Sequence, residues 1–170
     1  MKKIFLSFAF LFICTINANQ IVGSRKYSDF DSAKKEASLT WIVTSTKVGL
    51  FSSDVHGYVL DYTYKAEYDE KNNILRDMEL SFPILAMDSD SDSRDTKLRN
   101  KCLGNDQYKK ITIKINGPIF LKDQRNREYS GSVTIRGKNK KFTINIKPEL
   151  SHNRLKIKGT SRWSLSKMEI

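Results

Sequence analysis

The chain has 170 residues, with 30 Lys and Arg against 19 Asp and Glu, which gives a formal net charge of +11. This length suits a single domain with a hydrophobic core of its own. The basic residues are scattered along the chain rather than gathered in one run, so the sequence favours no specific nucleic-acid partner.

The N-terminus has the pattern of a secretory signal peptide. Lys2 and Lys3 precede an apolar run at residues 4–16, and Ala18 is a small residue at a suitable cleavage point. The apolar run is too short for a membrane span, which needs about 20 residues. A lipoprotein signal ending at Cys14 is disfavoured, because large residues precede that cysteine. We therefore predict that residues 1–18 are removed and that the protein is exported, either periplasmic or secreted.

Removal of 18 of the 170 residues would leave 152, with 28 basic and 19 acidic residues and a net charge of +9. Cys102 would then be the remaining cysteine, so no internal disulfide is expected. We predict an N-terminal extension at residues 19–38 and a β domain at residues 39–170.

From residue 39 onward the sequence alternates between apolar and polar residues with a period of two. Successive side chains of a strand point to opposite faces, so each stretch has one apolar face. Turn residues at 69–73 and 137–140 separate stretches and predict antiparallel hairpins. The pattern predicts an all-β antiparallel barrel or sandwich, and the alternation also places His56 and Arg76 on apolar faces. The apolar set predicted to face a ligand is Trp41, Tyr58, Leu60, Tyr62, Tyr64, Met78, Leu80, Phe82, Ile113, Val133, Ile135, Phe142, Ile144, Ile157 and Trp163.

One segment interrupts the alternation. Residues 88–93 alternate Asp and Ser, and residues 94–102 are predicted to form a short helix with Asp92 or Ser93 as its N-cap. Leu98 and Cys102, four residues apart, would face the core. A calcium loop starting at residue 88 is rejected, because Arg99 stands where an EF-hand needs its bidentate glutamate.

The sequence offers little support for catalysis or metal binding. It has two histidines, too few with Cys102 for a zinc site at suitable spacing. No Gly-x-Ser-x-Gly elbow or phosphate-cradling glycine loop is present. A Ser–His–acid triad stays open, but we predict no catalytic residue, no metal and no enzyme activity. His56 is predicted to be a polar contact at the barrel rim, where it could meet the head group of a ligand.

The tyrosines suggest a binding cavity. Four hydroxyls, those of Tyr58, Tyr62, Tyr64 and Tyr68, would be hard to satisfy in a dry core. Small residues on the same face, Gly131, Gly159 and Ser161, would leave room. The sequence therefore predicts an interior that holds an apolar small molecule.

Three segments in order resemble the YceI-like family of bacterial exported proteins: residues 57–72, residues 94–99 with Tyr108 and 111–112, and residues 131–137 with 142–144. The resemblance covers residues 39–170. It implies an extended antiparallel barrel, similar to lipocalins, with a helix between strands. It also implies a periplasmic binder of polyisoprenoid or other long-chain amphiphiles, often dimeric. A bound isoprenoid quinone or a fatty-acid-like ligand would be expected, with no other cofactor.

The chain departs from the family pattern at several positions. Lys97 stands where the family usually has His, and Lys109 and Lys141 stand where it usually has Pro. The family pattern also continues past the counterpart of residues 168–170 into a closing strand. We expect the barrel to close differently or to be open on one side.

Other functions remain as alternatives. A non-catalytic adhesion or scaffold module would have a filled core and a basic surface, with transient contact to an anionic membrane surface as a further candidate. An outer-membrane barrel would need its apolar face outward. A hydrolase would need an activated nucleophile, which the sequence does not reveal.

Overall fold

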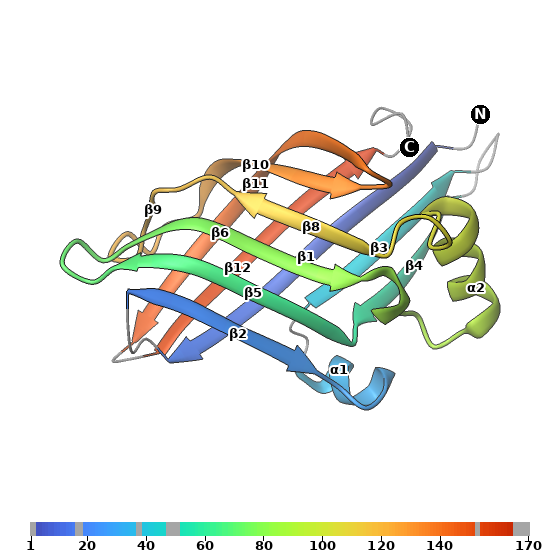
Figure 1. The fold of residues 1–170 in the computed structure, drawn as a ribbon, viewed down its shortest axis with the longest axis horizontal. Helices are drawn as coiled ribbons and strands as arrows, with labels where there is room; N and C mark the ends of the chain where they lie inside the picture. The colour runs from blue at the N-terminus through green and yellow to red at the C-terminus, as the bar shows by residue number, and fades with distance from the viewer. Residues whose placement is uncertain (1–2, 16–18, 37–38, 47–51, 152–153, 165–170) are drawn as a thin grey trace.

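The computed structural model describes residues 3–15, 19–36, 39–46, 52–151 and 154–164 (Figure 1). Its strands are β1 Lys3–Thr15, β2 Gln20–Lys26, β3 Leu39–Thr46, β4 Ser52–Val59, β5 Asp61–Asp69, β6 Ile74–Pro83, β7 Met87–Asp88, β8 Lys110–Ile115, β9 Ile119–Phe120, β10 Arg127–Ile135, β11 Lys138–Ser151 and β12 Arg154–Ser164. Its helical segments are α1 Phe30–Glu36, the 3₁₀ turn η1 Ile84–Ala86, α2 Asp92–Thr96 and the π-helical η2 Lys97–Cys102. None of the helices in these ranges is long and apolar enough to cross a bilayer.

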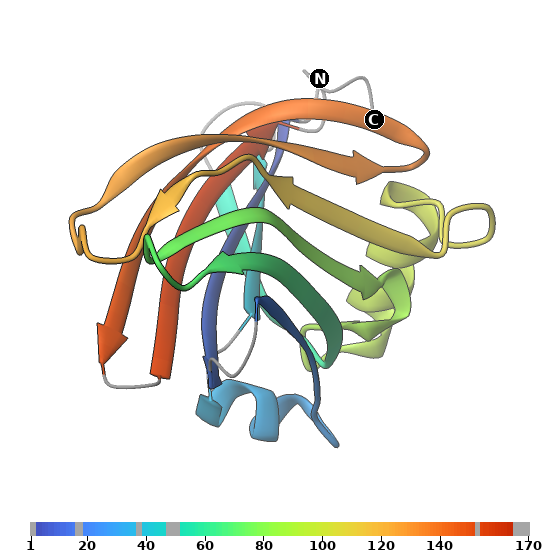
Figure 2. The same ribbon diagram turned by 60° about the vertical axis from the view of Figure 1, so that its left-hand side comes forward.

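All strands belong to one antiparallel sheet. Its order is β2-β5-β6-β8-β10-β11-β12-β1-β3-β4-β7, with β9 paired to β6. The sheet curls around its own apolar face, while α1 lies across one side and α2 with η2 lies at one end (Figure 2). The predicted all-β antiparallel, lipocalin-like architecture with an inserted helix is confirmed.

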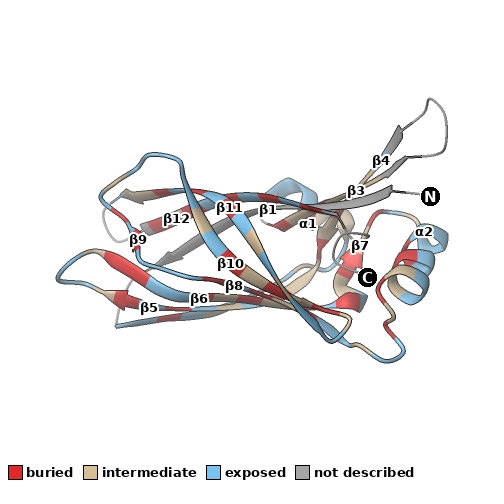
Figure 3. Ribbon diagram, turned by 90° about the horizontal axis from the view of Figure 1, so that it is seen from above, coloured by how far each residue is buried: buried red, intermediate tan, exposed pale blue. Residues whose placement is uncertain are grey.

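The period-two pattern correctly predicts the faces of the later strands. Ile111, Ile113 and Ile115 of β8 are buried, as are Val133 and Ile135 of β10. Along β12, residues 155, 157, 159, 161 and 163 are buried, whereas the described residues between them are exposed or half-buried (Figure 3). These inward faces join in one core. The sheet thus has apolar side chains inside and charged side chains outside. This is the reverse of the polarity expected for an outer-membrane barrel.

The alternation changes phase between β4 and β5, where the sequence reads as one continuous strand. The chain bends at Leu60, whose N–H donates to Ala86 O and whose carbonyl accepts from Tyr27 N–H. As a result Gly57 and Val59 face inward in β4, while Tyr62 and Tyr64 face inward in β5. The inward placement predicted for His56 was therefore wrong, since this residue is exposed.

A second phase change occurs in β6. The register with β5 shifts between Lys65 and Glu67, and Asp77 takes the positive φ of 48°. Such a bulge inserts one residue, so the side chains before and after it alternate in opposite phase. Leu75 is consequently fully buried and Arg76 is exposed, so the predicted inward position of Arg76 was wrong.

Both predicted hairpins and the predicted helix are present. The β10–β11 turn is tighter than expected, with Arg136 and Gly137 at φ 50° and 70°, as a two-residue hairpin requires. The helix starts at Asp92 with Ser91 in the N-cap position, so neither predicted cap residue takes that place. Leu98 is buried and Cys102 is half-buried against the core, as predicted.

The segment predicted as an N-terminal extension contains regular structure. β2 pairs with β5 over seven residues and forms one edge of the sheet. The helix α1 follows, with Asp29 Oδ1 accepting the N–H of Ser32 at 2.8 Å and Ala33 buried. The alternation does not reveal β2, because Ile21 is its only buried residue.

The segment predicted as a signal peptide is a strand in this structure. β1 pairs antiparallel with β12 from Phe5 to Thr15 and antiparallel with β3 from Lys3 to Phe10. It thereby joins the two halves of the sheet. The predicted cleavage point after Ala18 lies outside the described residues, and the signal peptide stays a prediction.

Candidate functional site

The interior of the curled sheet contains most of the predicted ligand-facing residues. Tyr58, Leu60, Tyr64 and Phe142 are half-buried. The other members of the set are buried, namely Trp41, Tyr62, Met78, Leu80, Phe82, Ile113, Val133, Ile135, Ile144, Ile157 and Trp163. That these residues contact a ligand stays a prediction.

Two aromatic pairs lie on this interior face. The rings of Phe142 and Trp163, on the adjacent strands β11 and β12, are 5.1 Å apart in an edge-on arrangement. The rings of Tyr62 and Tyr64 are 6.5 Å apart. Trp163 Nε1 donates to Ser161 Oγ at 2.7 Å. The indole is thus held by a polar contact while its ring stays apolar, as is usual for a buried tryptophan.

Two of the four tyrosines differ from the prediction, Tyr58 in its position and Tyr68 in having a protein partner for its hydroxyl group. Tyr58 packs against Phe30 of α1, with ring centroids 5.0 Å apart, on the face opposite to Gly57. Its predicted position inside the barrel was therefore wrong, because the bend at Leu60 reverses the face. The hydroxyl of Tyr68 donates to Asn73 Oδ1 at 3.2 Å in the adjoining turn. Tyr62 and Tyr64 remain as the interior pair.

The room expected at Gly131 is filled by an aromatic ring. A Cβ placed on Gly131 would come within 2.9 Å of the Phe142 ring and 2.5 Å of Lys114 O. The same holds at Gly23, where the Tyr64 ring lies within 2.5 Å of such an atom. Ser161 Oγ donates to Thr143 O at 2.8 Å. The prediction that Gly131 leaves free space was wrong, since the Phe142 ring occupies it. For Gly159 and Ser161 the expected room stays a prediction.

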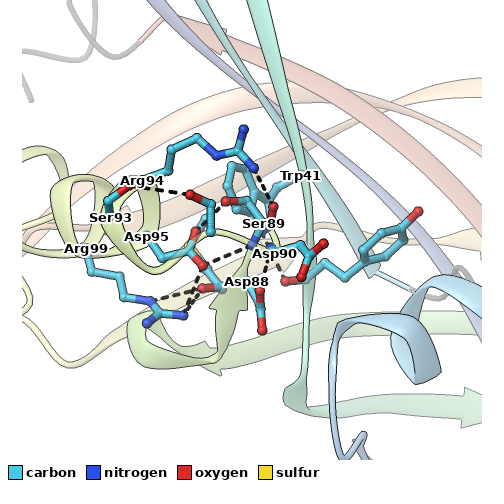
Figure 4. Close-up of polar contacts among 11 residues, drawn as sticks. Trp41, Asp88, Ser89, Asp90, Ser93, Arg94, Asp95 and Arg99 are labelled. Carbon is cyan, nitrogen blue, oxygen red and sulfur yellow. Dashed lines mark hydrogen bonds and ion pairs between the residues drawn. The ribbon is translucent and has the colours of Figure 1, made fainter.

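A polar cluster around a buried carboxylate lies where β7 and the turn after it meet α2 and η2 (Figure 4). The carboxylate of Asp95, only 2% exposed, accepts bonds from Ser89 Oγ at 2.7 Å and Ser89 N–H at 3.1 Å. Arg94 donates to Ser89 O at 2.8 Å, and Arg99 Nε donates to Met87 O at 3.0 Å. These bonds fix the helical insertion to the strand that precedes it.

The cluster was not predicted from the sequence, although one signal was available. Asp95 and Arg99 are four residues apart on one helical face, and their ion-pair distance is 3.8 Å. Asp88 instead accepts the N–H of Asp90 at 2.8 Å, as in an Asx turn. Within the described ranges no group of three His, Cys, Asp or Glu side chains could hold a metal ion.

Two open grooves lie on the outer face of β2, β5 and β6. The larger has a volume of about 510 Å³ and is lined by Val22, Thr63, Lys65 and Ser81, among others. The second, of about 210 Å³, continues along Gln20, Lys65 and Asp77. Tyr64 is the one member of the predicted interior set that lines either groove. The exposed lining residues Thr63 and Lys65 lie on the opposite face of β5 from the buried Tyr62 and Ala66.

Comparison with known proteins decides the family. Residues 29–167 match the model of the YceI-like domain. The chain belongs to the YceI-like family. No curated protein matches it significantly.

Among solved structures, a cysteine mutant of CJ YceI with a monobromobimane guest has 19% identity and a TM-score of 0.52, covering 62% of this chain and 64% of its own. The Campylobacter jejuni YceI protein that crystallizes with large solvent channels has 21% identity and a TM-score of 0.50, covering 61% and 63%. A polyisoprenoid binding domain from Saccharophagus degradans, implicated in plant cell wall breakdown, has 8% identity and a TM-score of 0.43, covering 96% and 97%. The alignment thus spans less than two thirds of the first two proteins, and the likeness concerns the fold.

The YceI-like motif residues have a definite structural place. Arg94, Asp95 and Arg99, from the segment that carried the resemblance, supply the helical side of the polar cluster. At a position where the family usually has Pro, Lys109 donates from Nζ to Asn105 O at 2.8 Å. Lys141, at another such position, lies opposite Ser132 in the β10–β11 ladder.

Proposed function

We propose that this YceI-like chain binds a polyisoprenoid or another long-chain amphiphile within its curled sheet, as a non-catalytic carrier, store or sensor. An isoprenoid quinone and a fatty-acid-like molecule are the candidate ligands. The supporting observation is the shared apolar interior of β3, β5, β6, β8, β10, β11 and β12. We further propose that the protein acts outside the cytoplasm, as the basic and apolar N-terminal pattern predicts.

The chemistry of this interior suits an unbranched or methyl-branched hydrocarbon chain. Burial of each methylene group gains about 0.8 kcal/mol before the cost of ordering the ligand. Tyr64 and Phe142 are half-buried while their neighbours on the same face are buried, so we place the first contacts of the chain there. The ring of Phe142 would have to move from Gly131 to admit it.

The two tryptophans of the sequence, Trp41 and Trp163, both lie buried on the interior face. Their fluorescence therefore reports on occupation of the interior. We expect saturable quenching when a long isoprenoid alcohol is added to the full chain, with weaker quenching by a short one. Native mass spectrometry of the protein purified from its own cells should show a hydrophobic mass that organic solvent removes.

Failure to detect any bound ligand would contradict the proposed function. If no mass copurifies and no isoprenoid alcohol or fatty acid changes the tryptophan emission, the interior is filled by the protein itself. The chain would then be the scaffold module with a filled core and a basic surface. Single Trp41→Phe and Trp163→Phe variants assign the signal to one side of the interior.

A further inference from the structure

Basic residues that are scattered in the sequence gather on one outer face of the sheet. From residue 141 onward, the alternation of β11 and β12 directs apolar residues inward and charged residues outward. Glu149 is the only acidic residue in the sequences of these two strands. We call the outward set the basic face; it comprises Lys141, Lys147, Lys156, Lys158 and Arg162.

The basic face retains an unfavourable arrangement of like charges. Lys147 and Lys158 stand directly opposite each other, a pairing that destabilises a sheet. Glu149 lies 3.6 Å from Lys147, 3.9 Å from Lys156 and 3.2 Å from Lys158. One carboxylate thus faces three ammonium groups, and a positive surplus remains.

The strands that flank the basic face add one acidic residue to it within the described ranges. On one side, Lys156 and Lys158 stand opposite Ile13 and Leu11 of β1, which has no acidic residue in its sequence. On the other side, β10 supplies Glu128, opposite Asn145. The side chains of Lys147 and Lys158 are 48% and 51% exposed, so their charges can reach an external partner.

We propose that the basic face docks on an anionic lipid bilayer. The proposal rests on the proposed function, because an apolar ligand dissolves in bilayers and has to be taken up from one or delivered to one. Charge complementarity supports a bilayer, since extended strands present their cations side by side toward a plane of phosphate groups. Each lysine near such a surface is expected to raise the affinity about fivefold at moderate ionic strength.

The test is flotation of the full chain with vesicles of phosphatidylcholine, alone or mixed with phosphatidylglycerol. We expect binding to the mixed vesicles only, decreasing as salt is added. The double variant Lys147→Gln/Lys158→Gln should lose about 25-fold in affinity. A matched control, Lys35→Gln/Lys101→Gln, removes the same charge from exposed positions of α1 and η2 and should bind as the wild type does.

Three results would overturn the proposal: equal binding to neutral vesicles, equal losses in the two double variants, or capture by dextran sulfate without capture by vesicles. The last would point to an anionic polymer. Tryptophan quenching by isoprenoid alcohol, measured without vesicles on the same variants, separates this question from the proposed function. Its failure in the wild type would refute ligand binding, whereas vesicle binding reports on docking.

Discussion

The indole ring of Trp41 lies directly over the backbone of Gly57: a Cβ added at Gly57 would come within 2.2 Å of two ring atoms. The two residues are opposite each other in β3 and β4. Trp41 Nε1 also donates to the carbonyl of the next residue, Tyr58, at 3.1 Å. The absence of a side chain at residue 57 is therefore a condition for the position of the tryptophan.

Gly57→Ala should destabilise the fold for this reason. Asp88 O also lies within 2.4 Å of the added carbon, so both a ring and a backbone would have to move. Overpacking of this kind costs about 1–3 kcal/mol or more. Urea unfolding followed by tryptophan emission measures the loss, and Ser130→Ala, at an exposed position of β10, should be nearly neutral. Wild-type stability of the Gly57 variant would show that the ring is not held there.

Asp95→Ala should be among the most damaging single substitutions. It removes the acceptor of two bonds from Ser89 and leaves the Arg99 guanidinium without its carboxylate. Breaking a buried pair by removing one partner costs about 3–5 kcal/mol. Asp92→Ala, at an exposed position of the same helix, is the control. Limited proteolysis should show cleavage within residues 88–105 in the Asp95 variant first, and an unchanged digestion pattern would contradict a clamping role.

Phe142→Ala should change stability and ligand uptake in opposite directions. Truncation of a fully buried phenylalanine to alanine lowers the free energy of unfolding by about 3–5 kcal/mol. Because Phe142 is half-buried, its truncation should lower it by about 2 kcal/mol. The same change vacates the space over Gly131 and should increase the affinity for isoprenoid alcohols. Phe120→Ala, on the exposed side of β9, is the matched control. Reduced affinity in the Phe142 variant would show instead that the ring is a required contact of the ligand.

The carboxyl group of Glu149 should titrate below its ordinary value of 4.5. A hydrogen bond from Lys158, with the charges of Lys158, Lys156 and Lys147, lowers its pKa. The contribution of this carboxylate to folding is thus present above the unfolded-state pKa and is lost as the pH falls through the lower folded-state pKa. Lys158→Gln should raise the pKa of Glu149 back toward 4.5, as carboxyl-carbon NMR would show. No change on this substitution would mean that the three ammonium groups do not share the carboxylate.

The fold was predictable where the strands are regular. In β8, β10, β11 and β12 each residue keeps its partner along the ladder, so a period of two identifies the buried face. The bend at Leu60 and the bulge at Asp77 each reverse the phase, and neither has a glycine or proline that would announce it. His56, Tyr58 and Arg76 were assigned to the wrong face for this reason alone.

The sequence predicted which residues face the interior better than it predicted which of them contact one another there. Alternation gives the direction of a side chain but not what it touches, so the rings over Gly23, Gly57 and Gly131 could not be foreseen. The Asp95 cluster was missed because its partners, Ser89 and Met87, belong to the preceding strand and turn. Only the fold brings them to the helix.

The position of β1 in the sheet has a consequence for the predicted removal of the signal peptide. Because β1 is antiparallel to both β12 and β3, these two strands run parallel to each other. If export processing removed residues 1–18, the edges of β12 and β3 could not join in the antiparallel ladder used elsewhere in the sheet. An antiparallel ladder at this place would need a further strand that runs opposite to both β12 and β3, from this or another molecule. Removal of the signal segment would thus open the sheet between β12 and β3, and a separate pairing step would have to close it.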